Sequence, residues 1–135
     1  MLRMDRDSNA IVEALSGEYM SIYTIEPETG RYREYCVASA YKQLGLSSGG
    51  DDFFRQFANE MEKVVNPDDL HKFRERFTKE NIFKDLGEKG SFHLPYILMI
   101  NGEQKPVSIK ITLSNRLDSE KLIAGIREWK ERKQK

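Results

Sequence analysis

The sequence has a single cysteine, Cys36, among its 135 residues, so it lacks the cysteines of an internal disulfide framework or a multi-cysteine zinc site. It also lacks the apolar run of about 18 residues that a membrane-spanning helix needs, and residues 1–10 lack the apolar core of a signal peptide. The sequence also has no excess of charge of either sign, because its 22 basic residues balance its 22 acidic ones. That balance argues against a nucleic-acid partner and a polybasic membrane-surface protein. These absences predict a cytoplasmic protein without membrane insertion.

Hydrophobic residues make up 39% of the sequence and charged residues 33%, which is typical of a soluble globular domain and not of a disordered chain. This length favours one domain, which buries roughly two-thirds of its unfolded surface. We therefore expect one hydrophobic core.

The first third of the sequence has the pattern of a helix followed by a hairpin. Residues 7–16 carry an apolar stripe followed by glycine, which predicts a short helix. Residues 19–25 and 31–38 are rich in β-branched and aromatic residues and predict two strands. Residues 26–30 contain the proline and glycine of a tight turn, and residues 39–44 predict a short helical piece.

The middle of the sequence is helical in its pattern. Residues 51–65 place apolar side chains three or four positions apart, as on one face of an amphipathic helix. Asn66 is a favoured helix cap and Pro67 a favoured first residue. A second helix is therefore expected from Asn66 to about Phe83, with the helical region ending at Gly87.

The last third of the sequence predicts three strands. Residues 91–100 and 104–114 alternate apolar with polar side chains, and Asn101–Gly102 between them is a strong hairpin signal. Pro95 places the first of these strands at an edge or a bulge. Residues 121–129 predict the last strand. The order of elements predicts an α+β fold: a five-stranded antiparallel sheet, helices covering one face, and an N-terminal flanking helix.

Residues 49–53, Gly-Gly-Asp-Asp-Phe, are similar to the GGDEF signature of diguanylate cyclases, which lies on a hairpin tip beside a metal–nucleotide site. Here the residues that follow have helical periodicity, and no second acidic segment precedes the motif at the end of an apolar strand. We therefore interpret the glycines as a break in the chain and Asp51 as the cap of the next helix.

The titratable and nucleophilic residues do not form a recognisable site in the sequence. His71 and His93 have no partner at metal-ligand spacing, and Cys36 has no adjacent base or orienting group. Asp68 and Asp69 suit the positive end of a helix dipole. No phosphate-binding loop, dinucleotide fingerprint or nucleophile elbow occurs. We therefore predict no metal site and no catalytic residues.

Several short motifs follow one another in order between residues 7 and 130. They are Ala14-Leu15 with Tyr19, Ile22-Tyr23-Thr24-Ile25 before Thr29-Gly30, Asp52-Phe53-Phe54, Val65-Asn66-Pro67-Asp68-Asp69 with Phe73, the strand after Gly102, and Leu122-Ile123-Ala124-Gly125-Ile126 with Glu128. In this order they resemble a PAS domain (sensory box), with the nearest match to the PAS modules that precede diguanylate cyclase domains in bacterial signalling proteins.

The resemblance implies a flanking helix at residues 1–17, a PAS-like sensor domain at residues 18–129, and the start of a C-terminal linker to an effector domain at residues 130–135. PAS modules sense a small ligand, a redox state or light through a cofactor, or only dimerise, and they signal through a C-terminal helix. The sequence departs from the family at Asn66, where such modules often have histidine, and at residues 128–130, where they often have Asp-x-Thr.

The resemblance does not identify a cofactor. Flavin-binding light sensors of the family carry a reactive cysteine in a helical stretch, and Cys36 lies on a predicted strand outside any such stretch. Flavin photochemistry is therefore not expected. Haem is not supported, because no motif surrounds His71.

We therefore expect a non-catalytic sensory or regulatory domain that binds a small ligand, forms a homodimer, or does both. The residues expected to line a ligand pocket are Tyr23, Phe57, Phe73, Phe77, Tyr96, Ile109 and Ile111; those expected at the dimer contact are Ile11, Val12 and Leu15; those expected at the signal exit are Glu128, Trp129 and Lys130.

Two alternatives remain open at this point. One is a small α+β enzyme that uses an enclosed pocket, with His93 or an aspartate as its general base. The other is a protein-interaction module with a filled core and no ligand. A cavity with convergent polar groups favours a sensor or an enzyme, whereas a packed interior favours the interaction module.

Overall fold

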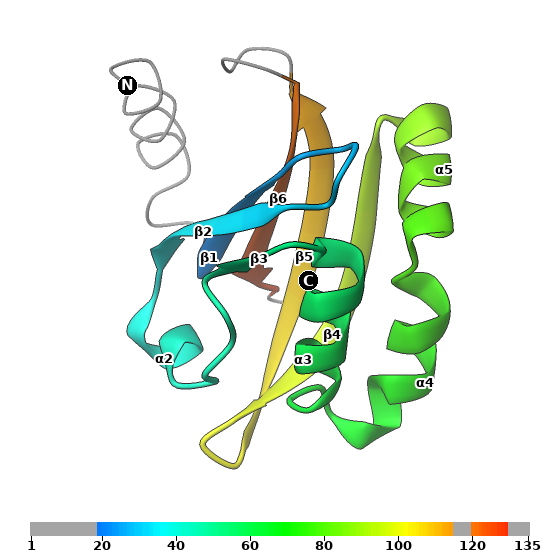
Figure 1. Ribbon diagram of the computed structural model, residues 1–135. Coiled ribbons are helices and arrows are strands. Elements are labelled where there is room, and N and C mark those ends of the chain that lie inside the picture. Colours follow the sequence, from blue (N-terminus) through cyan, green and yellow to red (C-terminus); the bar gives the residue numbers. More distant parts are fainter. Residues whose placement is uncertain (1–18, 115–119, 130–135) are drawn as a thin grey trace.

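Six antiparallel strands form one sheet in the order β3-β2-β1-β6-β5-β4, with helices over one of its faces (Figure 1). The computed structural model describes residues 19–114 and 120–129, apart from the side chains of Cys36 and Val37. The strands are β1 (Ser21–Ile25), β2 (Tyr32–Val37), β3 (Gly49–Gly50), β4 (Ser91–Ile100), β5 (Glu103–Ser114) and β6 (Lys121–Glu128). The predicted α+β class is confirmed. The sheet has one strand more than the five expected, because β3 is two glycines without strand propensity.

The helical layer consists of five short elements. They are α2 (Ser39–Lys42), the π-helical turn η1 (Phe53–Phe57), α3 (Ala58–Glu62), α4 (Pro67–Arg76) and α5 (Lys79–Lys89). η1 and α3 together occupy most of the amphipathic helix that was predicted for residues 51–65. The flanking helix predicted for residues 7–16 lies outside the described residues.

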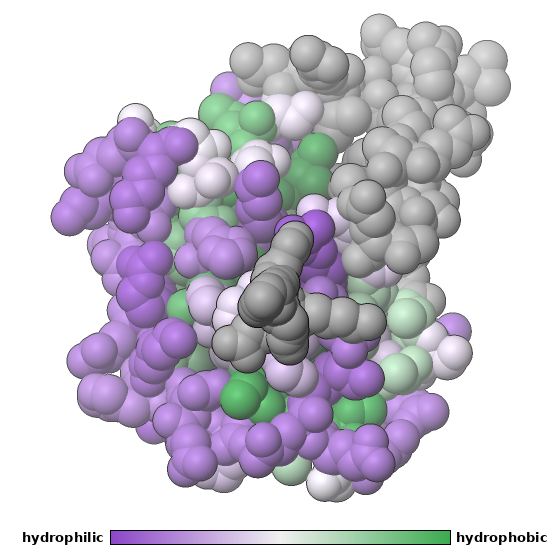
Figure 2. Space-filling view, turned by 180° about the vertical axis from the view of Figure 1, so that it is seen from behind, coloured by the Kyte–Doolittle hydropathy of each residue, from purple (hydrophilic) through white to green (hydrophobic). Residues whose placement is uncertain are grey.

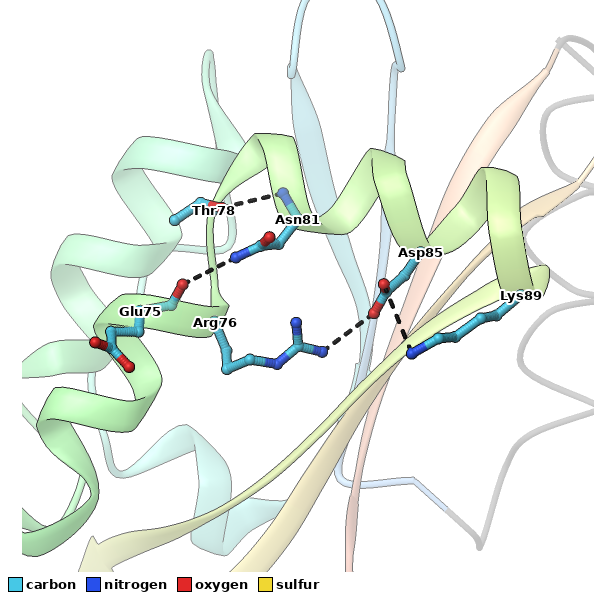
Figure 3. A network of polar contacts seen from close by, with 6 residues as sticks. All are labelled: Glu75, Arg76, Thr78, Asn81, Asp85 and Lys89. Atoms are coloured by element: carbon cyan, nitrogen blue, oxygen red, sulfur yellow. Dashed lines mark hydrogen bonds and ion pairs between the residues drawn. The ribbon is translucent and has the colours of Figure 1, made fainter.

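The single helix predicted over residues 66–83 is two helices in the structure. The backbone leaves the helical conformation at Phe77, with φ −86° and ψ 77°. The Thr78 hydroxyl then accepts a hydrogen bond from the Asn81 backbone N–H at 3.1 Å, which caps the new helix. The Asn81 side chain reaches back to the Glu75 carbonyl at 2.9 Å (Figure 3). The turn between α4 and α5 is thus held from both sides.

Two helix ends differ from the sequence prediction. The helical region continues past Gly87 and ends at Gly90, whose φ of 85° is the left-handed conformation that only glycine adopts at little cost. At the start of η1 the capping residue is Asp52 and not Asp51, because the Asp52 carboxylate accepts from the Arg55 backbone N–H at 3.3 Å.

The predicted hairpin at the bottom of the sheet in Figure 1 is confirmed, with β4 and β5 in continuous register through Ile100 and Glu103. Asn101 (φ 53°) and Gly102 (φ 78°) are both left-handed, as a two-residue turn of this kind requires. β4 is an edge strand, which explains how it accommodates Pro95.

The second half of the β4 edge is covered by the chain that leads into α4. The Asn66 N–H donates to the Ile97 carbonyl and the Met99 N–H donates to the Val64 carbonyl, both at 2.8 Å. The Asp69 carboxylate accepts from the Ile97 N–H, also at 2.8 Å. These bonds satisfy the outward backbone groups at this edge and fix α4 against the sheet.

The surface agrees with a soluble composition. Seen from behind, hydrophilic side chains predominate and hydrophobic ones lie between them in small patches (Figure 2). Leu113 and Trp129 are the only large hydrophobic side chains that the structure describes as exposed. Within the described residues, no helix is long and apolar enough to span a membrane.

Candidate functional site

The pocket residues predicted from the sequence meet in the space between the helices and the sheet. All of them are buried in one hydrophobic cluster. Tyr23 comes from β1, Phe57 from η1, Phe73 from α4, Phe77 from the α4–α5 break, Tyr96 from β4, and Ile109 and Ile111 from β5. The structure therefore brings together side chains that are up to 88 positions apart in the sequence, from position 23 to position 111.

Aromatic rings fill much of this cluster. Phe53 stacks on Phe57 with ring centroids 4.5 Å apart, and Phe73 stacks on Phe77 at 5.2 Å. The two stacks touch, since the Phe57 and Phe77 centroids are 5.6 Å apart. Phe53 is also among the aromatic residues that the sequence offers for such a pocket, because its spacing of four from Phe57 places both on one helical face. The rings of the two stacks therefore form one continuous aromatic cluster.

Two tyrosine hydroxyls are paired inside the cluster. The Tyr23 and Tyr41 hydroxyl oxygens are 2.7 Å apart. Burial raises the pKa of Tyr41 well above its usual 10.0, and burial raises the pKa of Tyr23 against the opposing effect of the hydrogen bond. Both phenols are therefore neutral at physiological pH. Sequence analysis missed Tyr41, because its four-residue helix α2 is too short to show periodicity.

Two other buried hydroxyls have no hydrogen-bond partner among the described residues. They belong to Tyr96, on the inner face of β4, and to Tyr32, on β2. Burial raises the pKa of Tyr96, and burial, followed by the charges of Glu60 and Glu34, raises the pKa of Tyr32 to about 12. An unpaired buried hydroxyl costs roughly 1–3 kcal/mol, so a hydrogen-bond partner at either position would stabilise the folded chain.

The histidines lie away from this cluster. His71 is on the exposed face of α4, with Nε2 3.1 Å from a Glu75 carboxylate oxygen. His93 pairs in register with Lys110 on the face of the sheet opposite the aromatic cluster. Partial burial and the positive charges of Lys110 and Arg127 lower the pKa of His93. His93, one of the two general bases considered for an enzyme, therefore does not face the aromatic cluster.

The other candidate residues have structural surroundings or are not described. Asp68 and Asp69 begin α4; the Asn66 side chain accepts from the Asp68 N–H at 2.8 Å, and Asp69 bonds to β4. Cys36 lies in β2, and its side chain is outside the described part. The described residues contain no group of three or more His, Cys, Asp and Glu side chains that could hold a metal ion.

The predicted signal exit is anchored to the sheet. The Glu128 carboxylate at the end of β6 is 3.6 Å from Lys105 Nζ of β5. Trp129, 45% exposed, donates its backbone N–H to the Pro106 carbonyl at 2.9 Å. Lys130 lies outside the described residues, as do the predicted dimer residues Ile11, Val12 and Leu15.

Comparison with known proteins identifies the fold but no family. No family model and no curated protein matches the sequence. The solved PAS domain of Bordetella pertussis BvgS is similar, with a TM-score of 0.53 and 16% identity over 94% of this chain and 89% of that chain. At this identity the likeness shows the fold alone, and the chain has a PAS-like α+β fold.

Two further solved structures are similar at lower TM-scores. A PAS domain from Desulfitobacterium hafniense has a TM-score of 0.42 and 20% identity over 87% of this chain and 99% of that chain. An RNA-binding light-oxygen-voltage receptor has a TM-score of 0.48 and 12% identity over 80% of this chain. This chain spans 27% of the length of that receptor.

Proposed function

We propose that this PAS-like chain is a non-catalytic sensory or regulatory domain of a bacterial signalling protein in the cytoplasm. In this proposal a small molecule in the aromatic cluster changes how the helices pack on the sheet. The observation that carries the proposal is the Tyr96 hydroxyl, which has no hydrogen-bond partner among the described residues and belongs to a buried apolar cluster. A ligand with one polar atom and an apolar body suits such a position.

The register of the sheet offers a route from Tyr96 to the end of the domain. Tyr96 of β4 pairs with Val107 of β5, and Val107 pairs with Glu128 of β6. Tyr96 is therefore two strands away from Glu128, which forms an ion pair with Lys105 of the intervening strand β5. A ligand shifts the equilibrium between two conformations of the domain only by the difference in its affinity for them. In this proposal, the packing around Tyr96, Val107 and Glu128 therefore differs between the two conformations.

The output proposed here is a change in a homodimer. Ile11, Val12 and Leu15 supply the apolar contact between two copies, and residues after Glu128 continue into an effector domain. A diguanylate cyclase is the effector that the sequence resemblance favours. A packed interface between two copies has only a few discrete arrangements. A small shift in the sheet can therefore change the dimer from one arrangement to another.

Native mass spectrometry of the full chain tests this proposal in one measurement. We expect a dimer, with a bound small molecule that is lost when the chain is unfolded and refolded. Ile11→Glu is expected to yield monomer, whereas Leu113→Glu, at an exposed apolar residue of β5, leaves the dimer intact. A monomer without a bound molecule at high concentration contradicts both parts of the proposal.

A second candidate function is favoured by the ring packing. The stacks formed by Phe53, Phe57, Phe73 and Phe77 leave the cluster filled by its own side chains, which suits an interaction module that works without a ligand. This alternative predicts a dimer whose mass equals that of two chains, without a bound molecule. It also predicts that the stability of the dimer does not change after unfolding and refolding, whereas the sensor should lose its ligand.

A further inference from the structure

A groove on the helical side of the molecule lies outside the aromatic cluster. It forms where the β1–β2 turn, η1, α3 and the break between α4 and α5 meet, and its volume is about 380 Å³. Small-molecule sites commonly have roughly 300–1,000 Å³. The groove therefore has the size for a ligand with one ring or a short chain.

The floor and one side of the groove are apolar. Phe77 and Ala58, both members of the buried cluster, reach the surface here. Phe54 differs from its neighbours Phe53 and Phe57, because its side chain is only half-buried and packs against Phe83 with ring centroids 5.6 Å apart. A ring face and two apolar surfaces are thus available to a ligand body.

The charge at the groove is positive and centred on Lys79. The Lys79 ammonium nitrogen is 5.7 Å from the centroid of the Phe54 ring, and no acidic side chain of the described residues forms an ion pair with it. The one carboxylate in the groove, Asp52, already accepts the Arg55 N–H and lies 3.8 Å from Arg55 Nε. A carboxylate that enters the groove therefore meets an unneutralised cation.

The position of Lys79 is not explained by helix stability. Lys79 is the first residue of α5, where the positive end of the helix dipole disfavours a cation. The i+3 and i+4 neighbours on α5 are Ile82 and Phe83, which give it no anion. The cation–π contact with Phe54 holds the ammonium group beside the groove, where it is available to an anionic ligand.

The walls of the groove are held in place before any ligand binds. On one side, the Thr78 cap and the ion pair between Arg76 and Asp85 fix the turn that carries Phe77 and Lys79 (Figure 3). On the other side, the Phe53 N–H donates to the Gly30 carbonyl at 2.7 Å, which ties η1 to the β1–β2 turn. A preformed site loses little conformational entropy on binding.

We propose that this groove binds a small organic carboxylate with an aromatic or short aliphatic body. The ligand body lies against Phe54 and covers Phe77 and Ala58, while its carboxylate pairs with Lys79. This site does not depend on a ligand in the aromatic cluster, so the two proposals can fail separately.

Titration of the full chain with sodium benzoate, followed by two-dimensional ¹H–¹⁵N NMR, tests the proposal. We expect saturable shifts centred on residues 54–59 and 77–80, with a Kd on the order of millimolar. Lys79→Gln should raise this Kd about two- to fivefold, as expected for a solvent-exposed charge pair. Phe54→Ala should raise it about two- to tenfold through the lost ring contact.

Matched controls separate this site from general binding of anions. Lys84→Gln removes an exposed charge from the same helix outside the groove, and should leave the Kd unchanged. Benzyl alcohol keeps the ring of benzoate but lacks its charge. Its Kd for the wild type should therefore be no lower than the Kd of benzoate for the Lys79→Gln variant. The proposal is overturned by the absence of saturable shifts, by an equal effect of Lys84→Gln, or by shifts centred on Tyr96.

Discussion

Arg76 and Asp85 join the two helices that sequence analysis expected to be one. The guanidinium Nη2 of Arg76 donates to Oδ2 of Asp85 at 3.1 Å across the α4–α5 break, and the Asp85 side chain is only 9% exposed (Figure 3). Lys89 Nζ lies 3.8 Å from the other carboxylate oxygen. Arg76 also lies over the Phe92 ring at 5.1 Å, so the pair connects the helical layer to the sheet.

Replacing Arg76 with Met should destabilise the fold. The buried Asp85 carboxylate would keep only Lys89 as a partner, and we expect a loss of about 1–3 kcal/mol in the free energy of unfolding. Urea denaturation followed by circular dichroism measures this loss. Arg76→Met combined with Asp85→Leu should lose less than Arg76→Met alone, since no unpaired charge remains. A larger loss in the double variant would contradict this account.

Two tyrosine-to-phenylalanine variants should have opposite effects on stability. Tyr41→Phe leaves the Tyr23 hydroxyl buried without its partner and should cost about 1–2 kcal/mol. Tyr96→Phe removes a hydroxyl that has no partner among the described residues, so stability should stay the same or rise. Thermal unfolding of both variants in ligand-free buffer provides the comparison. Equal losses would mean that the Tyr96 hydroxyl is hydrogen-bonded in solution.

Stability should fall at alkaline pH because of the buried tyrosines. Burial raises the pKa of Tyr23, Tyr41 and Tyr96, and that of Tyr32 to about 12. Unfolded tyrosines lose their protons near pH 10, so above that pH the folded state binds more protons than the unfolded state. The stabilisation is therefore complete below pH 10 and decreases as the pH rises towards the folded pKa values.

Absorbance at 295 nm measures this difference directly. The sequence has six tyrosines, and four of them have raised pKa values in the folded chain. At pH 10.5 the folded protein should therefore show far less phenolate than the same chain in concentrated urea. Identical titration curves in the two solvents would contradict the burial of these hydroxyls.

Two glycine-to-alanine substitutions should also differ in sign. Gly87 lies inside α5 with open space where a Cβ would be added, so Gly87→Ala should stabilise the protein by about 0.5–1 kcal/mol. Gly102 has open space as well but a φ of 78°, so Gly102→Ala should cost about 1 kcal/mol. Chemical denaturation of the two variants compares them, and a gain in both would mean that the β4–β5 turn relaxes without strain.

The elements of the fold that local sequence patterns mark could be predicted from the sequence. The alternation in β4 and β5 and the Asn101–Gly102 turn predicted the longest hairpin of the sheet correctly. The break at Phe77 was missed, because neither glycine nor proline marks it in the sequence. Only Thr78, a residue that favours helix caps, marked the position where the second helix begins.

The aromatic residues of the candidate site could be predicted from the sequence. The contacts and orientations of their side chains could not. Tyr23, Phe57 and Tyr96 were identified because buried aromatic residues at strand or helix spacing point inward. Their surroundings depend on partners far along the chain: Tyr41 is 18 positions from Tyr23. Phe54 is half-buried beside the fully buried Phe53, and it lies in a π-helical turn that has no signal in the sequence.

The fold class could be read from the sequence: the alternating strands and the helical apolar spacing predicted an α+β fold with an aromatic core. Such features depend on composition and on neighbours within a few residues, which any segment carries with it. Which hydroxyl groups in that core have hydrogen-bond partners depends on the tertiary structure. In the part of the chain that the structure describes, the Tyr23 hydroxyl has a partner and the Tyr96 hydroxyl has none, because hydrogen bonds between distant segments depend on how helices and strands pack.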